Sequence, residues 1–399
     1  MTFKLKYHLK RGANLDMNLL GKIEDVVSRE RSDQSLSHRL LLAILRLLSF
    51  FYGSAVFLRN SAYRSGLLHR KKLPRPVVSI GNILVGGAGK TPTVLFLAGL
   101  LKARGYRPAV LSRGYCRDKT APEVQVVTSE MRVEQTGDEP LLIAKKLPEV
   151  PILVGRDRYQ SGKLGMVKFK PDLFVLDDAF QHFALERDLD IVVIDVSRPL
   201  IQPLLPRGYL REPVRGLERA GAFLLTRIDQ TTAQQVEAVE EYLCAKFPGK
   251  KIFHASYQPV GLIPYRQWLA NSSFTGEKAL LRDFTGKKAG LFAGVASPAS
   301  VRKTLSGIGV CVVNTLKLPD HQPVTVEELV HLSRDSAIKG AEILVTTEKD
   351  AVKLGELCTS SEIPGILPLY ILTIELSLRE GEEDFLHWLA RQIPLKAEK

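Results

Sequence analysis

From Pro76 onward, short runs of apolar and β-branched residues alternate with longer segments of helical pattern. Near-continuous apolar runs are typical of parallel strands in a sheet that helices cover on both faces. One series of runs precedes residue 230, and a second series follows it. The predicted strands are 77–82, 108–113, 123–128, 151–155, 172–178, 190–196, 222–227, 251–256, 289–295, 309–315, 342–347 and 369–376. The pattern predicts an α/β core over residues 76–230 and a second, smaller α/β domain over residues 231–399.

A different pattern precedes this core, because residues 40–58 are almost uniformly apolar and carry only one charge, Arg46. At about 1.5 Å per residue, such a helix is only just long enough to span a bilayer. On a helical wheel Arg46 shares one side with two further arginines, as in a helix that lies in the membrane interface. We therefore expect an N-terminal extension over residues 1–37 and a basic, amphipathic, membrane-associated region over residues 38–75. A single membrane span and a helix packed on the core stay open as alternatives.

The charge balance supports an anionic partner. Lys and Arg number 56 against 43 Asp and Glu, a net charge of +13, and residues 34–117 hold 14 basic residues and no acidic one. A basic stretch of this kind suits a membrane surface, a nucleotide or a nucleic acid. The sequence contains no nucleic-acid-binding module, so we expect no nucleic-acid partner, and no obligate protein partner is evident. The four cysteines show no paired or metal-ligand spacing, which favours a reducing compartment; they are Cys116, Cys244, Cys311 and Cys358.

The first predicted strand leads into a glycine-rich turn that ends in Lys90 and Thr91 and opens a predicted helix. This context is typical of a phosphate loop. Backbone N–H groups and the helix N-terminus hold phosphates, the lysine reaches the β- and γ-phosphates, and the threonine hydroxyl binds Mg²⁺. The strict pattern has a glycine where Leu84 stands, so this loop is a variant, with glycines at three later positions. Because the strand, the glycine-rich turn and the helix are all present, we still predict a P-loop NTPase-type core.

A phosphate loop needs a carboxylate at the end of a neighbouring strand to hold Mg²⁺, and acidic residues stand at such positions in this sequence. Asp177 and Asp178 end one predicted strand and point in different directions, so that one can face Mg²⁺ and the other a catalytic group. Helix capping is the alternative for this pair and for Asp138 and Glu139, and Asp195 is a weaker candidate at another strand end. Loops beyond strand ends are where α/β sheets bind ligands. Such loops carry further polar groups at 112–115, 137–140, 210–213, 319–321 and 347–350.

In order and spacing, several motifs resemble the tetraacyldisaccharide 4'-kinase family of lipid A biosynthesis, from about residue 38 to residue 390. The motifs are SIGNILVGGAGKTP, LSRGY, GDEP, LDDAFQH, LLPRGYLREP, PDH and TTEKDAVKL. The resemblance implies a kinase that transfers the γ-phosphate of ATP to the 4'-hydroxyl of a tetraacyldisaccharide 1-phosphate and so forms lipid IVA. It also implies a peripheral or monotopic enzyme on the cytoplasmic face of the inner membrane of a Gram-negative bacterium. Its partners would be the lipid disaccharide and the anionic membrane surface.

The resemblance also implies roles for the residues that match these motifs. ATP would be bound by Leu84, Val85, Gly86, Gly87, Ala88, Gly89, Lys90 and Thr91, and Mg²⁺ by Thr91 and Asp177. In catalysis, Lys90 would hold the phosphates, Asp138 would be the general base, and Asp178 and His321 would assist, with the carboxylate partner of His321 left open. The headgroup or the nucleotide would contact Arg113, Glu139, His182, Arg211 and Glu212. Two departures leave the acceptor fit open: Ala179 replaces a glycine of the family, and the histidine motif, which in the family continues to an aromatic residue, reads Asp-His-Gln-Pro-Val at residues 320–324.

Two other functions stay open on the sequence. A membrane-positioning or assembly ATPase would use a similar loop, but Val85 replaces the signature lysine near the start of that loop. A GTP-binding protein is suggested by residues 226–229, where Arg227 stands for the lysine of a guanine-reading motif. Arginine and lysine are not interchangeable against a base. The sequence leaves open the acyl-chain preference, the oligomeric state and the role of residues 1–33.

Overall fold

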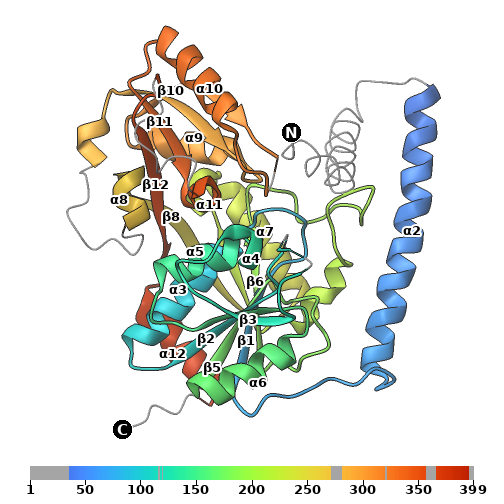
Figure 1. Cartoon of the computed structure of the whole chain (residues 1–399). Coiled ribbons are helices and arrows are strands. Elements are labelled where there is room, and N and C mark those ends of the chain that lie inside the picture. Colours follow the sequence, from blue (N-terminus) through green and yellow to red (C-terminus); the bar gives the residue numbers. More distant parts are fainter. Residues whose placement is uncertain are drawn as a thin grey trace. The chain divides into compact units, whose positions relative to one another are not determined.

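The computed structural model describes residues 36–115, 117, 118, 120–270, 281–319, 321–355 and 365–394 (Figure 1). The chain divides into two compact units. The first unit combines the N-terminal part, up to His69, with residues 83–85 and 199–217. The second combines residues 70–82, 86–198 and 218–399. The predicted N-terminal extension lies outside the described residues, apart from residues 36 and 37.

The second unit is built on one sheet of twelve strands, in the order β10-β9-β11-β12-β8-β7-β6-β1-β5-β2-β4-β3. The strands are β1 (Val77–Gly81), β2 (Pro108–Ser112), β3 (Val124–Val127), β4 (Ile152–Gly155), β5 (Leu173–Asp177), β6 (Leu189–Asp195), β7 (Ala222–Thr226), β8 (Lys251–Pro264), β9 (Lys288–Ala293), β10 (Cys311–Lys317), β11 (Ile343–Thr347) and β12 (Leu369–Leu378). Every predicted strand is present. Because β3 pairs antiparallel with β4, and β12 with β8, the sheet is mixed rather than fully parallel.

Helices cover both faces of this sheet (Figure 1), because its central strands are apolar on both sides. In β5, Leu173 and Val175 join one cluster of buried side chains, whereas Phe174 and Leu176 join another. Successive residues of a strand point to opposite faces, so two cores form. The first core packs against α3 (Lys90–Ala103), α5 (Asp138–Lys146) and α12 (Glu382–Gln392), and the second against α6 (Arg158–Phe169). The predicted α/β fold is thereby confirmed.

Apart from the N-terminal helix described below, the remaining described helices lie mostly in the later part of the chain. They are α4 (Val133–Thr136), α7 (Ala233–Lys246), α8 (Tyr265–Ala270), α9 (Pro298–Gly307), α10 (Val326–Ile338) and α11 (Glu348–Leu354), with single 3₁₀ turns at Val214–Arg219, Ile228–Gln230 and Leu281–Phe284. Cys244 and Cys311 are exposed free thiols. Cys116 and Cys358 lie outside the described residues.

One long strand, β8, joins the strands that precede residue 230 to those that follow. Its first residues pair in parallel with β7, and the stretch from Ala255 to Pro264 pairs antiparallel with β12. The sequence predicts this strand only as far as residue 256, so the structure extends it. The sheet therefore continues without a break across the boundary predicted at residue 230, and the division into two α/β domains stays a prediction.

The first unit contains α2 (Leu36–Arg64), a helix of 29 residues. By length and composition its stretch Arg39–Arg64 could cross a membrane, and only 11% of its most apolar window is buried. One side packs within the unit: Ser49 Oγ donates a hydrogen bond to the Leu204 carbonyl oxygen, and Tyr52 Oη donates one to the Arg211 carbonyl oxygen. Large apolar side chains are exposed at Leu40, Leu41, Ile44, Leu47, Leu48, Phe50, Phe51, Phe57 and Leu58. This exposure is unlike a helix packed on a core and is consistent with membrane association.

Candidate active site

The glycine-rich turn lies between β1 and the first residue of α3, Lys90, as the phosphate-loop pattern predicts. Gly86 has φ 102° and Gly89 has φ 87°, backbone conformations that favour glycine. Gly89 also lies against Tyr257, whose hydroxyl occupies the space that a Cβ at this position would need. The backbone N–H groups at the start of α3 have no partner within the helix. The turn can therefore present them to an anion.

Replacing Gly89 with alanine is expected to abolish nucleotide binding and to lower the melting temperature. The new Cβ would overlap the Tyr257 hydroxyl, and the left-handed conformation adds strain. Gly249→Ala is the matched control, because Gly249 has φ 80° but no heavy atom within 4 Å of its Cβ position. Thermal melting and ATP titration of both variants test the expectation, and equal losses in the two variants would contradict it.

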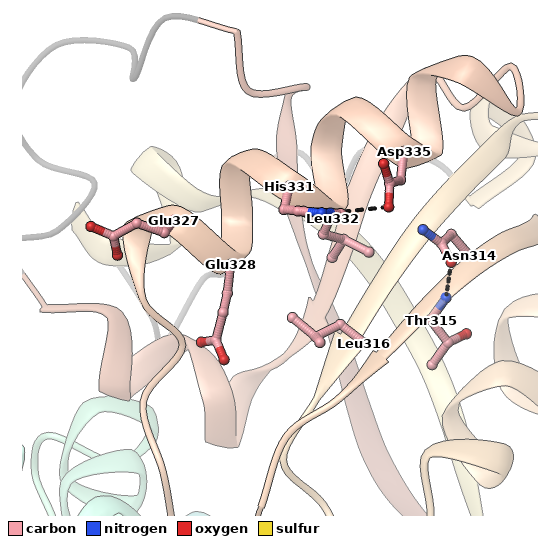
Figure 2. Close-up of a pocket in the computed structure, with 8 residues that line it drawn as sticks. All are labelled: Asn314, Thr315, Leu316, Glu327, Glu328, His331, Leu332 and Asp335. Carbon is pink, nitrogen blue, oxygen red and sulfur yellow. Dashed lines mark hydrogen bonds and ion pairs between the residues drawn. The ribbon is translucent and has the colours of Figure 1, made fainter.

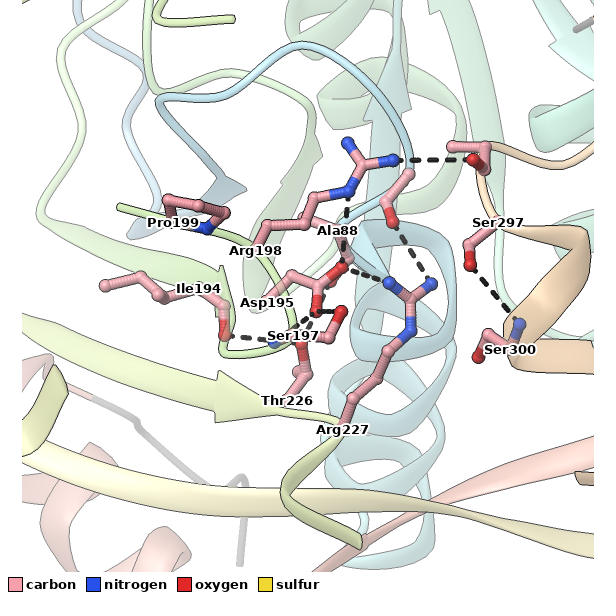
Figure 3. A network of polar contacts seen from close by, with 12 residues as sticks. Ala88, Ile194, Asp195, Ser197, Arg198, Pro199, Thr226, Arg227, Ser297 and Ser300 are labelled. Carbon is pink, nitrogen blue, oxygen red and sulfur yellow. Dashed lines mark hydrogen bonds and ion pairs between the residues drawn. The ribbon is translucent and has the colours of Figure 1, made fainter. Parts of the chain in front are cut away.

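The ends of β6 and β7 hold this turn from one side (Figure 3). Thr226 Oγ1 donates a hydrogen bond to the Ala88 carbonyl oxygen, and Arg227 Nη2 donates one to the Gly87 carbonyl oxygen, each at 3.2 Å. The Arg227 guanidinium also pairs with the buried carboxylate of Asp195. The segment with a likeness to a guanine-reading motif therefore contacts the backbone of the phosphate loop through its first two residues.

Two carboxylates lie at the end of β5, as the sequence predicts. Asp177 is fully buried and accepts a hydrogen bond from Ser112 Oγ at 3.1 Å. Asp178 has φ 47°, and its Oδ1 lies 3.6 Å from Lys90 Nζ. Burial raises the pKa of Asp177 to about 7, and the negative charges of Glu139 and Asp178 add to the rise despite Lys90. A cation bound next to Asp177 would therefore strongly stabilise the ionised form of its carboxylate.

This carboxylate fits a Mg²⁺ ion. Asp177 Oδ1 is buried and has no hydrogen-bond partner among the described residues. Within that part of the chain no group of three or more His, Cys, Asp or Glu side chains could hold a metal. Mg²⁺ bound with nucleotide needs only one or two protein ligands, since phosphate oxygens and water complete its shell. Asp177 together with the Thr91 hydroxyl therefore matches the donor set that such an ion uses.

A second acidic centre forms where α5 begins. Asp138 is the first residue of this helix and is almost fully buried. His321 Nδ1 lies 2.9 Å from Asp138 Oδ2, although 183 residues separate the two in the sequence. Burial by itself would raise the pKa of Asp138, but the His321 hydrogen bond and the Lys349 charge outweigh it and lower the pKa to about 2. The structure thus shows that Asp138 is the carboxylate that pairs with His321.

Ion pairs connect α11 to the start of α5 and to its last turn. Lys349 Nζ lies 3.1 Å from Glu139 Oε1 and 3.9 Å from Asp138 Oδ2. Lys146 Nζ, at the other end of α5, lies 2.8 Å from Glu348 Oε1. The Lys90–Asp178 pair is a separate contact, but both groups lie near Asp177, because the charges of Asp178 and Glu139 each raise the pKa of that carboxyl. Lys349 is a site residue to which the sequence reasoning assigned no role.

A group of positive side chains lies near the carboxylates at the end of β5. Arg158, the first residue of α6, is buried, and burial together with the charge of exposed Arg113 lowers its pKa to about 10. Burial and the charges of Arg158 and Arg187 lower the pKa of His182 to about 4, so this imidazole is neutral at neutral pH. His182 Nε2 is buried without a hydrogen-bond partner in the described residues. The sequence reasoning missed Arg158, although its position after β4 follows the strand-end rule.

The remaining predicted residues belong to the first unit. Leu84 forms an antiparallel bridge with Leu210 there, and the Val85 N–H donates a hydrogen bond to the Tyr209 carbonyl oxygen. The Arg211 N–H donates a hydrogen bond to the Ile83 carbonyl oxygen, and Glu212 is fully buried. The first unit thus brings the start of the phosphate loop together with the LREP motif. The second unit brings together the other predicted site residues.

A separate hollow of about 400 Å³ lies between β10 and α10 (Figure 2). It is lined by Asn314, Thr315, Leu316, Glu327, Glu328, His331, Leu332 and Asp335, none of them a predicted site residue. His331 Nδ1 lies 3.0 Å from Asp335 Oδ2, and both side chains are largely exposed. The hollow therefore contains a His–Asp pair like Asp138–His321, but on the exposed surface.

Comparison with known proteins agrees with the geometry. Residues 41–394 match the family model of tetraacyldisaccharide-1-P 4'-kinase. The tetraacyldisaccharide 4'-kinase of Geobacter metallireducens is 38% identical over 347 residues, which cover 86% of this chain and 96% of the relative. The protein of the same name from Syntrophus aciditrophicus is 38% identical over 348 residues, with 84% and 89% coverage.

A solved structure supports the same assignment. The crystal structure of LpxK from Aquifex aeolicus in complex with ATP superposes with a TM-score of 0.66 at 33% sequence identity. The match covers 88% of this chain and 99% of that chain. Sequence and fold therefore agree over nearly the whole length, and the chain belongs to the tetraacyldisaccharide-1-P 4'-kinase family.

Proposed function

We propose that this protein is an ATP-dependent kinase that phosphorylates the 4'-hydroxyl of a tetraacyldisaccharide 1-phosphate, a lipid A precursor, to form lipid IVA. The observation that carries the proposal is that two charged centres lie near Asp177: the Lys90–Asp178 pair, and the Asp138–His321 pair with Lys349 and Glu139. The first centre belongs to a phosphate loop, and the second is a buried carboxylate–histidine pair suited to accept a proton.

Positioning and charge neutralisation dominate phosphoryl transfer, since the reaction needs little covalent chemistry from the protein. The backbone of residues 84–91 holds the phosphates, and Lys90 Nζ stabilises charge on their non-bridging oxygens. Thr91 and Asp177 hold Mg²⁺, which when bound neutralises charge on the phosphates. Asp178 keeps Lys90 directed toward the site through their contact at 3.6 Å.

A sugar hydroxyl becomes an effective nucleophile when its proton is accepted during attack. Asp138 is the acceptor in this proposal, because its lowered pKa of about 2 keeps it ionised at neutral pH. His321 Nδ1 contacts both carboxylate oxygens, at 2.9 and 3.1 Å. The histidine therefore fixes the carboxylate and shares the proton that arrives on it. Lys349 holds Glu139 beside this centre.

The lipid is bound by groups around these two centres. The headgroup or the nucleotide contacts the residues that match the family motifs, which are Arg113, Glu139, neutral His182, Arg211 and Glu212. The α2 helix places the enzyme on the anionic, cytoplasmic face of the inner membrane. Residues after 230 close over the site as a smaller domain. In support of this closure, His321 and Lys349 both reach the start of α5 from that part of the chain.

The full-length protein, assayed with Mg²⁺ and γ-radiolabelled ATP in mixed micelles, is expected to transfer label to the tetraacyldisaccharide 1-phosphate. Chromatography of the lipid fraction measures the product. Excess unlabelled ATP should compete with the label, and excess GTP should compete far less. Folded protein that hydrolyses ATP but never labels the lipid would contradict the proposal and favour a positioning or assembly ATPase.

A further inference from the structure

The loop after β6 brings a second arginine against the phosphate loop (Figure 3). Arg198 Nη1 lies 2.9 Å from the position that a Cβ would take at Gly86. Its Nη2 donates a hydrogen bond to the Ala296 carbonyl oxygen at 3.4 Å, and its Nε lies 3.9 Å from Asp195 Oδ2. The guanidinium approaches the turn this closely because residue 86 has no side chain.

Asp195 also serves three other groups. Its Oδ2 pairs with the Arg227 guanidinium, and its Oδ1 accepts hydrogen bonds from the Ser197 N–H at 3.0 Å and from Ser197 Oγ at 2.6 Å. One buried carboxylate therefore faces two guanidinium groups, and the closer one is Arg227. This trio of side chains carries a net positive charge directly beside the phosphate loop.

The two arginines differ in what they do to the turn. Arg227 donates to the Gly87 carbonyl oxygen and has a side chain that is only 12% exposed, so it shapes the backbone of the loop. The Arg198 side chain is 30% exposed and lies against Gly86. A partly exposed guanidinium at the rim of an anion-binding turn is placed to meet the anion. Arginine also binds phosphate oxygens in a bidentate manner.

We infer that Arg198 binds the terminal phosphate of the nucleotide and stabilises negative charge on the phosphoryl group as it is transferred. The inference rests on the proposed function, in which ATP is the phosphoryl donor. The terminal phosphate carries the most negative charge of the three, so a cation at the rim of the loop is stabilised most by that group. In phosphoryl transfer, charge spreads over the equatorial oxygens of the transferred group, and an arginine there accelerates the reaction strongly.

The test compares a nucleotide that carries a terminal phosphate with one that lacks it. Calorimetry in the presence of Mg²⁺ measures the affinity of the full chain for the β,γ-imido analogue of ATP and for ADP. Arg198→Ala is expected to weaken binding of the analogue about tenfold to a hundredfold, as for a lost charged hydrogen bond, and to leave ADP binding within about twofold. Arg198→Lys should recover part of the loss, because it restores the charge without the bidentate geometry.

Arg227→Ala is the matched variant, since Arg227 shares the Asp195 carboxylate but shapes the loop. It should weaken the binding of both nucleotides by similar factors. If Arg198→Ala does the same, Arg198 only shapes the loop and the inference is wrong. Melting temperatures show whether each variant is folded, and the lysine variant keeps the test decisive if the alanine variant is not. The readout needs no lipid acceptor, so failure of the proposed lipid kinase activity would leave this test intact.

Discussion

Lys90→Ala is expected to lower phosphoryl transfer by at least about a thousandfold, as when a cation or donor that stabilises the transition state is removed. Lys90 is the first residue of α3 and only 9% exposed. Its ammonium group lies beside Asp178, and the residue follows directly on the glycine turn, where the proposal places the phosphates. Without this lysine, the negative charge that develops on the transferred group is stabilised by one cation fewer in a largely buried site. The transfer assay on the lipid acceptor measures this loss directly.

Lys102→Ala is the control for the loss of positive charge. Lys102 lies on the same helix, but its side chain is 40% exposed and pairs with exposed Glu149. Exposed ion pairs contribute little, so this variant should keep the transfer rate. Lys90→Ala should also float with anionic vesicles as the unaltered protein does, because the apolar side chains of α2 are unchanged. A Lys90→Ala variant that leaves the vesicles would show that nucleotide chemistry and membrane association are not separate functions.

Asp138→Asn is expected to lower kcat by a factor of about a hundred to ten thousand, which is the range for a general acid–base group. Asparagine keeps the size of the side chain but cannot accept the hydroxyl proton. The affinity for ATP should stay within about twofold, because the contacts of Lys90 and the glycine turn do not involve Asp138. Rapid-quench measurement of the transfer step, beside a nucleotide titration, separates the two effects.

Asp335→Asn is the matched control, because Asp335 and His331 form the same kind of pair at 3.0 Å on an exposed face of α10. Its activity should equal that of the unaltered protein. His321→Ala should lower kcat less than Asp138→Asn does, since the histidine positions the carboxylate and shares its proton. The assigned role of Asp138 is wrong if Asp138→Asn, folded by its melting curve, retains full kcat.

The sequence predicts every strand of the described sheet because each contains a run of apolar or β-branched residues, and β1, β2, β4, β5, β6 and β7 are buried throughout. Strand direction is a different matter. The antiparallel pairing of β3 with β4 and of β12 with β8 depends on which neighbour each strand lies beside, and no local pattern records that. The strand β8 was predicted too short because Pro259, which has no N–H to donate, interrupts its pattern. The structure accommodates this proline at an irregularity opposite Thr373 and Ile374.

In the candidate site, too, some residues can be predicted from the local sequence and others depend on contacts between distant segments. The phosphate loop and Asp177 are local features, since a strand, a turn and a helix follow one another in the chain. The partner of Asp138 is not local: His321 reaches it from the loop between β10 and α10, across 183 residues. Lys349 and Arg198 follow strands, as sites in α/β sheets do, but many basic residues share that property. Only their distances to Glu139 and Gly86 distinguish them.

Because the sheet continues through β8, the two halves of the chain cannot be exchanged between relatives at an arbitrary point. A fragment that ended at residue 230 would leave the edge of β7 open, and open edges of apolar strands pair with other chains. The register that covers this edge runs from Ala222 opposite Lys251 to Leu225 opposite His254. Exchange of the distal half between relatives should therefore succeed when the crossover leaves β7 and β8 from one parent, and should produce aggregates when it separates them.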